Sequence, residues 1–245
     1  MVEDNAFNRK VAGRFLEKLG HATTFAENGE VAVRLAAEVR FDLILMDMQM
    51  PVLDGIEATR AIRAAGGPSS TVPIVALTAN ASDSDRERCV EVGMNSFETK
   101  PVPMERLRAL VARWCDNHEP MTEAVRTDAG RGGDRPFAAI VDAARVADLV
   151  EAIGEDGLVE LREAFASDAA SLLLDLGAAM AANDPVWTDA VLHTIKGSAS
   201  NIGYSAVAEL AEAMRHAGPD DGTRVRLEDE LRRVSAGGTT RGTAA

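Results

Sequence analysis

The first 115 residues alternate short apolar runs with amphipathic stretches. Compact apolar runs of strand length lie at 41–47 and 72–78, and weaker strand candidates lie at 21–26 and 95–98. Helical periodicity marks the stretches between them, at 7–19, 29–39, 55–65, 82–92 and 104–114. Strands that are apolar on both faces and separated by helices indicate a parallel sheet covered on both sides. The pattern predicts a doubly wound α/β domain over residues 1–115, with a five-stranded parallel sheet.

The pattern changes at residue 116. Residues 116–137 intersperse Gly and Pro with charges, which predicts a flexible linker. Beyond it, apolar residues from Leu158 to Met180 recur at spacings of 3, 4 or 7, which predicts one long helix. Further helices are expected at about 142–153, 186–202, 205–217 and 223–234. Four or five helices in this length favour an antiparallel bundle over residues 138–235, followed by a disordered tail at 236–245.

Composition narrows the classes of function. The 245 residues are 46% hydrophobic and 27% charged, which is an ordinary globular composition. A net charge of −13 argues against binding nucleic-acid phosphates. No apolar run approaches the ~18 residues of a membrane span, so we expect no membrane contact by this chain. The N-terminus carries no export signal and there are two cysteines, so we expect a reducing, cytoplasmic location.

Residues able to do chemistry stand at the ends of the predicted strands. Glu3 and Asp4 close the first strand and Asp47 the third, while Thr78 and Lys100 follow the fourth and fifth. Ligands of open parallel sheets bind beyond the carboxyl ends of the strands, so these side chains should converge. Three clustered acids need a cation, and hard oxygen ligands suit Mg²⁺. The set predicts a phosphoryl-transfer site that works by positioning and charge neutralisation.

This domain resembles the receiver domain of two-component response regulators over about 115 residues. Four separated motifs carry the resemblance: Val2-Glu-Asp-Asn5, Met46-Asp-Met-Gln-Met-Pro-Val-Leu-Asp-Gly55, Ala76-Leu-Thr-Ala79 and Lys100-Pro101. The resemblance implies that Asp47 accepts a phosphoryl group from a phosphohistidine. It also implies that Thr78 and Lys100 contact the phosphoryl oxygens and that Phe97 is the aromatic switch residue. The Mg²⁺ ligands that it implies are Glu3, Asp4, Asp47 and the backbone carbonyl of Gln49.

Two features of this region depart from simple expectations. A phosphatase of the haloacid-dehalogenase type also has an Asp after an apolar strand, but it needs a second Asp where this chain has Gln49. Only Met1 and Val2 precede the acid pair, whereas a central strand has about five residues. We therefore expect a truncated first strand, from a chain that begins inside a longer protein or has a trimmed start.

A histidine in the second domain forms another candidate site. Leu192, Ile195, Ala199 and Ile202 make the buried stripe of a predicted helix, and His193 lies about 100° around from Leu192. Lys196, Gly197 and Ser200 share the histidine's face. A helical Gly costs about 1 kcal/mol relative to Ala, and here it would let another protein approach the imidazole. The bundle carries most of the negative charge, yet residues 190–208 contain no acid, which predicts a neutral-to-positive docking patch.

The string Leu192-His-Thr-Ile-Lys-Gly-Ser198 resembles the signature of histidine phosphotransfer (HPt) domains. The resemblance covers residues 138–235 and implies a four-helix bundle without an ATP site. It implies that His193 accepts and donates phosphoryl groups through a ring nitrogen, that Lys196 assists electrostatically, and that Gly197 and Ser200 leave space for a docking partner. Ser200 stands where Gly is common in the family.

Together the two resemblances predict a phosphorelay protein. Asp47 would take phosphoryl from an upstream histidine kinase domain, and His193 would carry it to or from the aspartate of a downstream response regulator. The tandem is typical of the C-terminal half of hybrid sensor histidine kinases, but this sequence shows no ATP-binding kinase domain. The alternative is a non-relaying receiver that regulates an attached or partner kinase. The signal, the partners' identities, the direction of flow and the oligomeric state are not encoded in these patterns.

Overall fold

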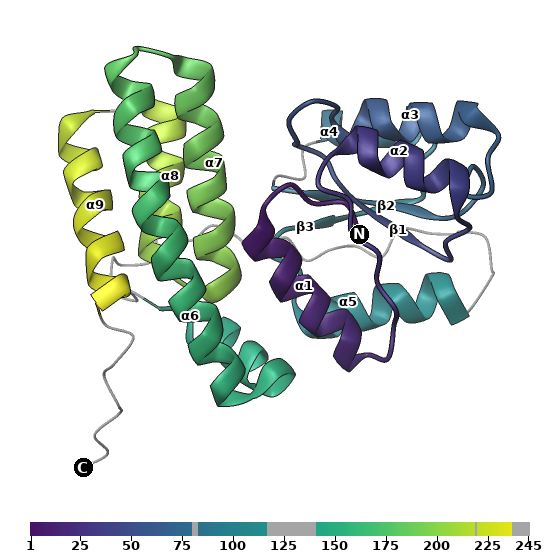
Figure 1. Ribbon diagram of the computed structural model, residues 1–245, viewed down its shortest axis with the longest axis horizontal. Coiled ribbons are helices and arrows are strands. Elements are labelled where there is room, and N and C mark those ends of the chain that lie inside the picture. The colour runs from purple at the N-terminus through teal and green to yellow at the C-terminus, as the bar shows by residue number, and fades with distance from the viewer. Residues whose placement is uncertain (80–82, 117–140, 219, 237–245) are drawn as a thin grey trace.

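The computed structural model describes residues 1–79, 83–116, 141–218 and 220–236 (Figure 1). Its first part is a parallel sheet of β1 (Ile44–Asp47), β2 (Ile74–Thr78) and β3 (Ser96–Thr99), in the order β1-β2-β3. β1 and β2 are buried along their whole length. The register pairs Asp47 with Leu77 and Thr78 with Thr99, so the strands end together at one edge.

Helices cover both faces of this sheet, as the sequence predicts. α1 (Ala6–Lys18) and α5 (Met104–Val111) lie on one face, and α5 continues as a wider π-helical turn over Ala112–Asp116. α2 (Gly29–Glu38), α3 (Gly55–Ala65) and α4 (Asp83–Glu91) pack with the other face. Successive side chains along each strand point to opposite faces of the sheet. Leu45 and Val75 pack with α1 and α5, whereas Ile44 and Ile74 pack with α2 and α3. The fold is therefore the expected doubly wound α/β domain.

The prediction of five strands is only partly met. Val2 makes isolated parallel bridges to Ala26 on one side and to Met46 on the other. Val2 therefore lies next to β1, and Ala26 lies next to Val2. These two positions extend the sheet through isolated bridges and form no strand. At the first position Met1 and Val2 are the only residues before Glu3, which is too short for a ladder. The segment at 21–26, expected as a strand, makes its ladder contact at Ala26 alone.

The second part is a helical bundle of α6 (Ala143–Ala181), α7 (Pro185–Ile202), α8 (Ser205–Ala217) and α9 (Asp221–Ala236). The helices expected at 142–153 and from Leu158 onward are joined into α6, which leaves helical geometry at Gly154 (φ 74°, ψ 172°). Asp142 and Asp184 cap α6 and α7 by accepting hydrogen bonds from the backbone amides of the first turn. Most of the predicted linker (116–137) and almost all of the predicted tail (236–245) lie outside the described residues.

Among the described helices α6 alone is long and apolar enough to cross a membrane, by length and composition. The expectation that this chain makes no membrane contact stays a prediction. In the structure α6 supplies Leu158, Leu161, Phe165 and Leu176 to the bundle core, each at most 5% exposed.

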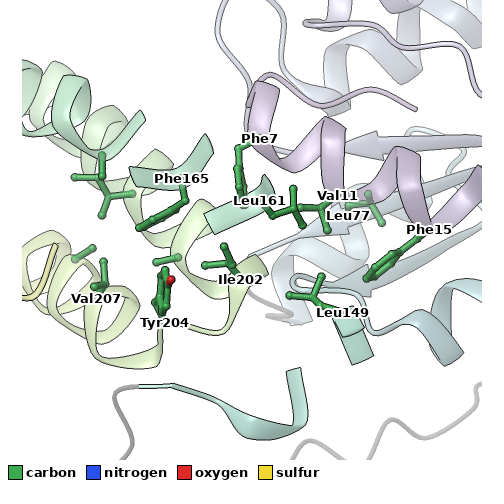
Figure 2. Close-up of a cluster of buried hydrophobic side chains, with 14 of the residues drawn as sticks. Phe7, Val11, Phe15, Leu77, Leu149, Leu161, Phe165, Ile202, Tyr204 and Val207 are labelled. Atoms are coloured by element: carbon green, nitrogen blue, oxygen red, sulfur yellow. The ribbon is translucent and has the colours of Figure 1, made fainter. Parts of the chain in front are cut away.

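The apolar core is continuous between the two parts. Phe7 of α1 meets Phe165 of α6 edge to face, with ring centroids 5.9 Å apart, and Phe165 meets Tyr204 at 5.1 Å. Figure 2 shows Phe7 beside Leu161 and Phe15 beside Leu149, each pair joining α1 to α6. The other cluster, on the α2 and α3 side, contains residues of the α/β domain only. One face of the sheet domain is thus closed on itself, and the opposite face is shared with the bundle.

Two glycines give a matched test of this packing. A Cβ added to Gly55 would lie 2.2 Å from the Asp47 carbonyl oxygen, so Gly55→Ala must displace the backbone beside Asp47. Gly177 is exposed on α6 with nothing within 4 Å of an added Cβ. We expect Gly55→Ala to destabilise the α/β domain by about 2 kcal/mol and Gly177→Ala to stabilise the bundle by about 1 kcal/mol. Hydrogen exchange in increasing urea measures both, and unchanged protection of β1 in Gly55→Ala would contradict the clash.

Candidate functional site

Three carboxylates gather at the edge of the sheet where the strands end. Glu3 and Asp47 are each 2% exposed and Asp4 is half-buried. One carboxylate oxygen from each of the three lies within 4.8 Å of the others. Glu3 and Asp4 are brought there by the bridges of Val2, and Asp47 is the last residue of β1. The convergence expected from strand ends 43 residues apart is therefore present in the fold.

Lys100 is the cation between these acids. Its Nζ lies 2.5 Å from Glu3 Oε2 and 2.7 Å from Asp47 Oδ2. The backbone positions it, because Lys100 N donates to the Thr78 carbonyl at 2.8 Å at the end of β2, and a cis peptide bond to Pro101 follows. Burial alone would lower the pKa of Lys100, but the charges of Asp47 and Glu3 outweigh burial and raise this pKa. The ammonium group is therefore charged and shared by two buried carboxylates.

One ammonium group does not balance three acids. Burial raises the pKa of Asp47 to about 7; Lys100 opposes this shift and Glu3 adds to it. Burial and then the charge of Glu3 also raise the pKa of Asp4. The cluster thus holds more negative charge than Lys100 offsets, and its donors are all hard oxygens. Glu3, Asp4 and Asp47 fit a divalent cation such as Mg²⁺, which would favour the ionised form of Asp47.

The other predicted residues of this domain lie around the same edge. Thr78 ends β2 and is 9% exposed. Gln49 N donates to Asp47 Oδ1 at 3.2 Å, which orients the carboxylate, while metal ligation by the Gln49 carbonyl stays a prediction. Phe97 lies in β3, half-buried, with the Arg86 guanidinium 4.4 Å from its ring centroid. Its switching role stays a prediction.

The helical face predicted around His193 is present on α7. Leu192, Ile195, Ala199 and Ile202 are at most 1% exposed and point into the bundle. His193, Lys196, Gly197 and Ser200 line one pocket, which Glu3, Asp4 and Lys100 line from the other side. Lys196 Nζ is 2.8 Å from Glu212 Oε1 of α8, so the lysine is held beside the imidazole. The acid edge of the sheet and the histidine face of α7 therefore open into the same space.

Polar contacts that the sequence did not reveal hold the two faces together. Asn5 Nδ2 donates to Ser198 Oγ at 2.7 Å, and Asn201 Nδ2 donates to Asn8 Oδ1 at 2.7 Å. Gly197 gives this approach its room, because an added Cβ would lie 3.4 Å from Asn8 Nδ2. In this structure α1 of the same chain approaches Gly197, while docking of another protein there stays a prediction. An asparagine at a buried helical position, as Asn8 is, was the available signal in the sequence.

The imidazole ring of His193 is neutral near pH 7. Burial first, and then the charges of Arg215, Lys100 and Lys196, together lower its pKa to about 4. Nδ1 is buried without a hydrogen-bond partner among the described residues. At neutral pH the ring therefore carries a free lone pair, which a protonated imidazole would lack.

The first prediction for this site concerns Lys100. Lys100→Met leaves Glu3 and Asp47 buried without their cation, so we expect a loss of about 3 kcal/mol in the stability of the α/β domain. Millimolar Mg²⁺ should recover part of this loss by taking over the charge compensation. Thermal unfolding with and without Mg²⁺ measures the effect. Lys10→Met, on the exposed side of α1, is the control and should change little. Equal stability of Lys100→Met and the parent without Mg²⁺ would contradict the role of Lys100.

The second prediction concerns protonation of His193. Its folded pKa lies below the unfolded value of about 6.5, so the unfolded chain binds more protons between these values. Stability should therefore be complete above pH 6.5 and fall as the pH drops toward 4. NMR of the imidazole nitrogens should show His193 titrating near pH 4, with His193→Gln to identify its signals. A midpoint near 6.5 would show that the ring is solvated and not buried as described.

Comparisons with known proteins agree with the division of the chain into two domains. Residues 1–112 match the model of the response regulator receiver domain, and residues 160–237 match the model of the Hpt domain. The sensor protein GacS of Pseudomonas syringae pv. syringae is 40% identical over 115 residues, covering 46% of this chain and 13% of that protein. Hybrid signal transduction histidine kinase A of Dictyostelium discoideum is 40% identical over 117 residues, covering 46% of this chain and 5% of the relative.

Solved structures give similar matches. The receiver domain of a sensor histidine kinase from Pseudomonas aeruginosa PAO1, solved with a magnesium ion coordinated in its active-site cleft, is 46% identical, with a TM-score of 0.44. The match covers 47% of this chain and 94% of that one. This chain spans only a small part of the curated relatives, 13% of GacS for example. The chain belongs to the two-component signalling families: it is a receiver domain followed by an Hpt domain, the arrangement of hybrid histidine kinases.

Proposed function

We propose that this chain is a phosphorelay module in which a phosphoryl group moves between Asp47 and His193. The observation that carries the proposal is the shared pocket, lined by Glu3 and Lys100 from the receiver domain and by His193 and Lys196 from α7. Lys100, which is 2.7 Å from Asp47, also lowers the pKa of His193 through its charge. The two candidate phosphoacceptors therefore act within one electrostatic environment.

On the receiver side, Asp47 is the acceptor. Its carboxylate attacks the phosphorus of a phosphohistidine on an upstream kinase domain, the P–N bond breaks, and an acyl phosphate forms. Lys100 and the Thr78 hydroxyl then face the phosphoryl oxygens from the neighbouring strand ends. Glu3, Asp4 and Asp47 would hold Mg²⁺, which when bound supplies positive charge for the phosphoryl oxygens.

On the Hpt side, His193 is the next acceptor. A lone pair of the neutral ring attacks the phosphorus, the P–O bond to Asp47 breaks, and its electron pair returns to the carboxylate. The ring keeps its own proton on the other nitrogen. Lys196 compensates the added negative charge, and the same chemistry in reverse returns the group to an aspartate. A separate response regulator is the proposed downstream partner.

Labelling distinguishes this relay from a receiver that only regulates a kinase. The full chain is incubated with Mg²⁺ and radiolabelled acetyl phosphate at neutral pH, and label is assigned by chemical stability. Acyl phosphates are lost in base, whereas phosphohistidine is lost in acid. We expect both kinds of label in the parent chain, base-labile label only in His193→Gln, and neither in Asp47→Asn. Arg60→Gln, an exposed change on α3, should match the parent.

Two outcomes would refute the relay. If His193 stays unlabelled although Asp47 is labelled in the same chain, the receiver is a regulatory module. If Asp47→Asn still acquires acid-labile label at the parental rate from acetyl phosphate, then His193 is labelled without Asp47 and the proposed order is wrong.

A further inference from the structure

The first part of α6 stands apart from the rest of the bundle. Residues 143–153 precede the break at Gly154, where the backbone leaves helical geometry. The match to the Hpt domain begins later, at residue 160. We call residues 143–153 the bridging segment. Its start is fixed to the bundle, because Asp142 N donates to the Gly203 carbonyl at 2.7 Å, just after α7.

The bridging segment packs against the receiver domain. Leu149 is fully buried and belongs to one core cluster with Val11, Phe15 and Leu107 of α1 and α5. Figure 2 shows Leu149 facing Phe15. Lys18 Nζ of α1 donates to the Glu151 carbonyl. The face of α1 that the segment covers would otherwise be apolar and exposed to water.

Arg145 joins the segment to three other elements. It is 6% exposed, and its Nη1 donates to the Val102 carbonyl, at 3.2 Å, in the loop that follows Lys100. Its Nε and Nη2 donate to the carbonyl and side-chain oxygens of Asn201 at the end of α7. Its guanidinium also lies 5.4 Å from the ring centroid of Phe15. Burying a guanidinium costs free energy unless its N–H donors are hydrogen-bonded. The contacts of Arg145 therefore favour the arrangement in which the segment packs against the receiver domain.

A chain of hydrogen bonds continues from Arg145 to the acid cluster. Asn201 accepts from Arg145 and donates to Asn8 Oδ1 at 2.7 Å. Asn8 Nδ2 in turn donates to Glu3 Oε1 at 2.8 Å, while Glu3 Oε2 meets Lys100. Every link between the bridging segment and the acid cluster is therefore a direct contact. Docking and the geometry of the phosphoacceptor site share the same side chains.

We propose that the bridging segment is an intramolecular docking element that holds this chain's own receiver domain over His193, so that transfer occurs within one chain and competing receivers are excluded. The inference rests on the proposed relay and names its partner. A tether alone raises the local concentration of the receiver domain near His193. The bridging segment would in addition fix the orientation of that domain relative to the imidazole. An isolated receiver that competes for His193 must displace α1 from Gly197 and Asn201.

The test uses Arg145→Gln and Leu149→Asp in the full chain, with Arg60→Gln as the matched control. Transfer within one chain is followed as acid-labile label on His193 at two chain concentrations tenfold apart. The parent rate should not depend on concentration. Each docking variant should lose at least about tenfold in this rate, as expected for a lost charge-assisted or buried contact.

The docking substitutions should have the opposite effect on phosphoryl transfer between two chains. A His193→Gln chain labelled on Asp47 serves as donor, and an Asp47→Asn chain serves as acceptor. Adding Arg145→Gln to both chains should raise this transfer, because neither active face is then covered by its own partner domain. A variant that had merely unfolded would lose both kinds of transfer, so such a loss in both variants would overturn the docking role.

Hydrogen exchange tests docking without any phosphoryl chemistry. Amides of α1 (6–18) and of the bridging segment should exchange faster in both docking variants, while α8 and β2 keep their parental protection. Unchanged exchange of α1 together with unchanged transfer within the chain would overturn the proposal. Absence of label on His193 in every chain, combined with faster exchange of α1 in the variants, would refute the relay and leave the docking element supported.

Discussion

The ammonium group of Lys100 is the interaction on which the receiver site depends. Two carboxylates, Glu3 and Asp47, are buried almost completely. The free-energy cost of burying their negative charges would be too high without a cation at hydrogen-bond distance. The backbone bond from Lys100 to the end of β2 places that cation, so sheet register and site electrostatics are the same constraint. Burial, and to a smaller extent the charge of Glu3, raises the pKa of Asp47, so a second positive charge at this site would favour the ionised carboxylate.

The two faces of the receiver sheet have different roles. On the α2 and α3 side the core is complete within the domain, whereas on the α1 and α5 side it runs into the bundle through Phe7 and Phe165. The shared face couples apolar packing at α1 to polar contacts at the strand ends. Asn5 caps the helix that carries Phe7, and Asn8 lies in the first turn of that helix. Sliding α1 along the bundle would disturb both at once.

Periodicity and motif spacing were sufficient to predict the features that follow from the order of residues along each strand or helix. The α/β layering, the stripe through Leu192 and Ile195, and the meeting of Asp47 with Lys100 follow from alternation and from strand ends sharing an edge. Periodicity identifies a buried position without identifying its neighbour, so it did not predict that α1 also packs against the bundle. Asn201 and Arg145 carry contacts between domains, and polar residues give no period from which such partners could be inferred. The strand expected at 21–26 failed because its ladder partner at Val2 is one residue long.

The shared pocket also has a consequence for the order of events in time. Any phosphoryl donor must approach Asp47 from the strand-end edge, and in this structure α7 lies across that edge. In the proposed relay, an outside kinase would therefore have to reach Asp47 in a more open arrangement of the two domains than this one. The apparent loading rate is therefore the intrinsic rate multiplied by the fraction of time the chain spends open. Loading and transfer within the chain would then alternate, because each needs a different arrangement of α7 and the receiver domain.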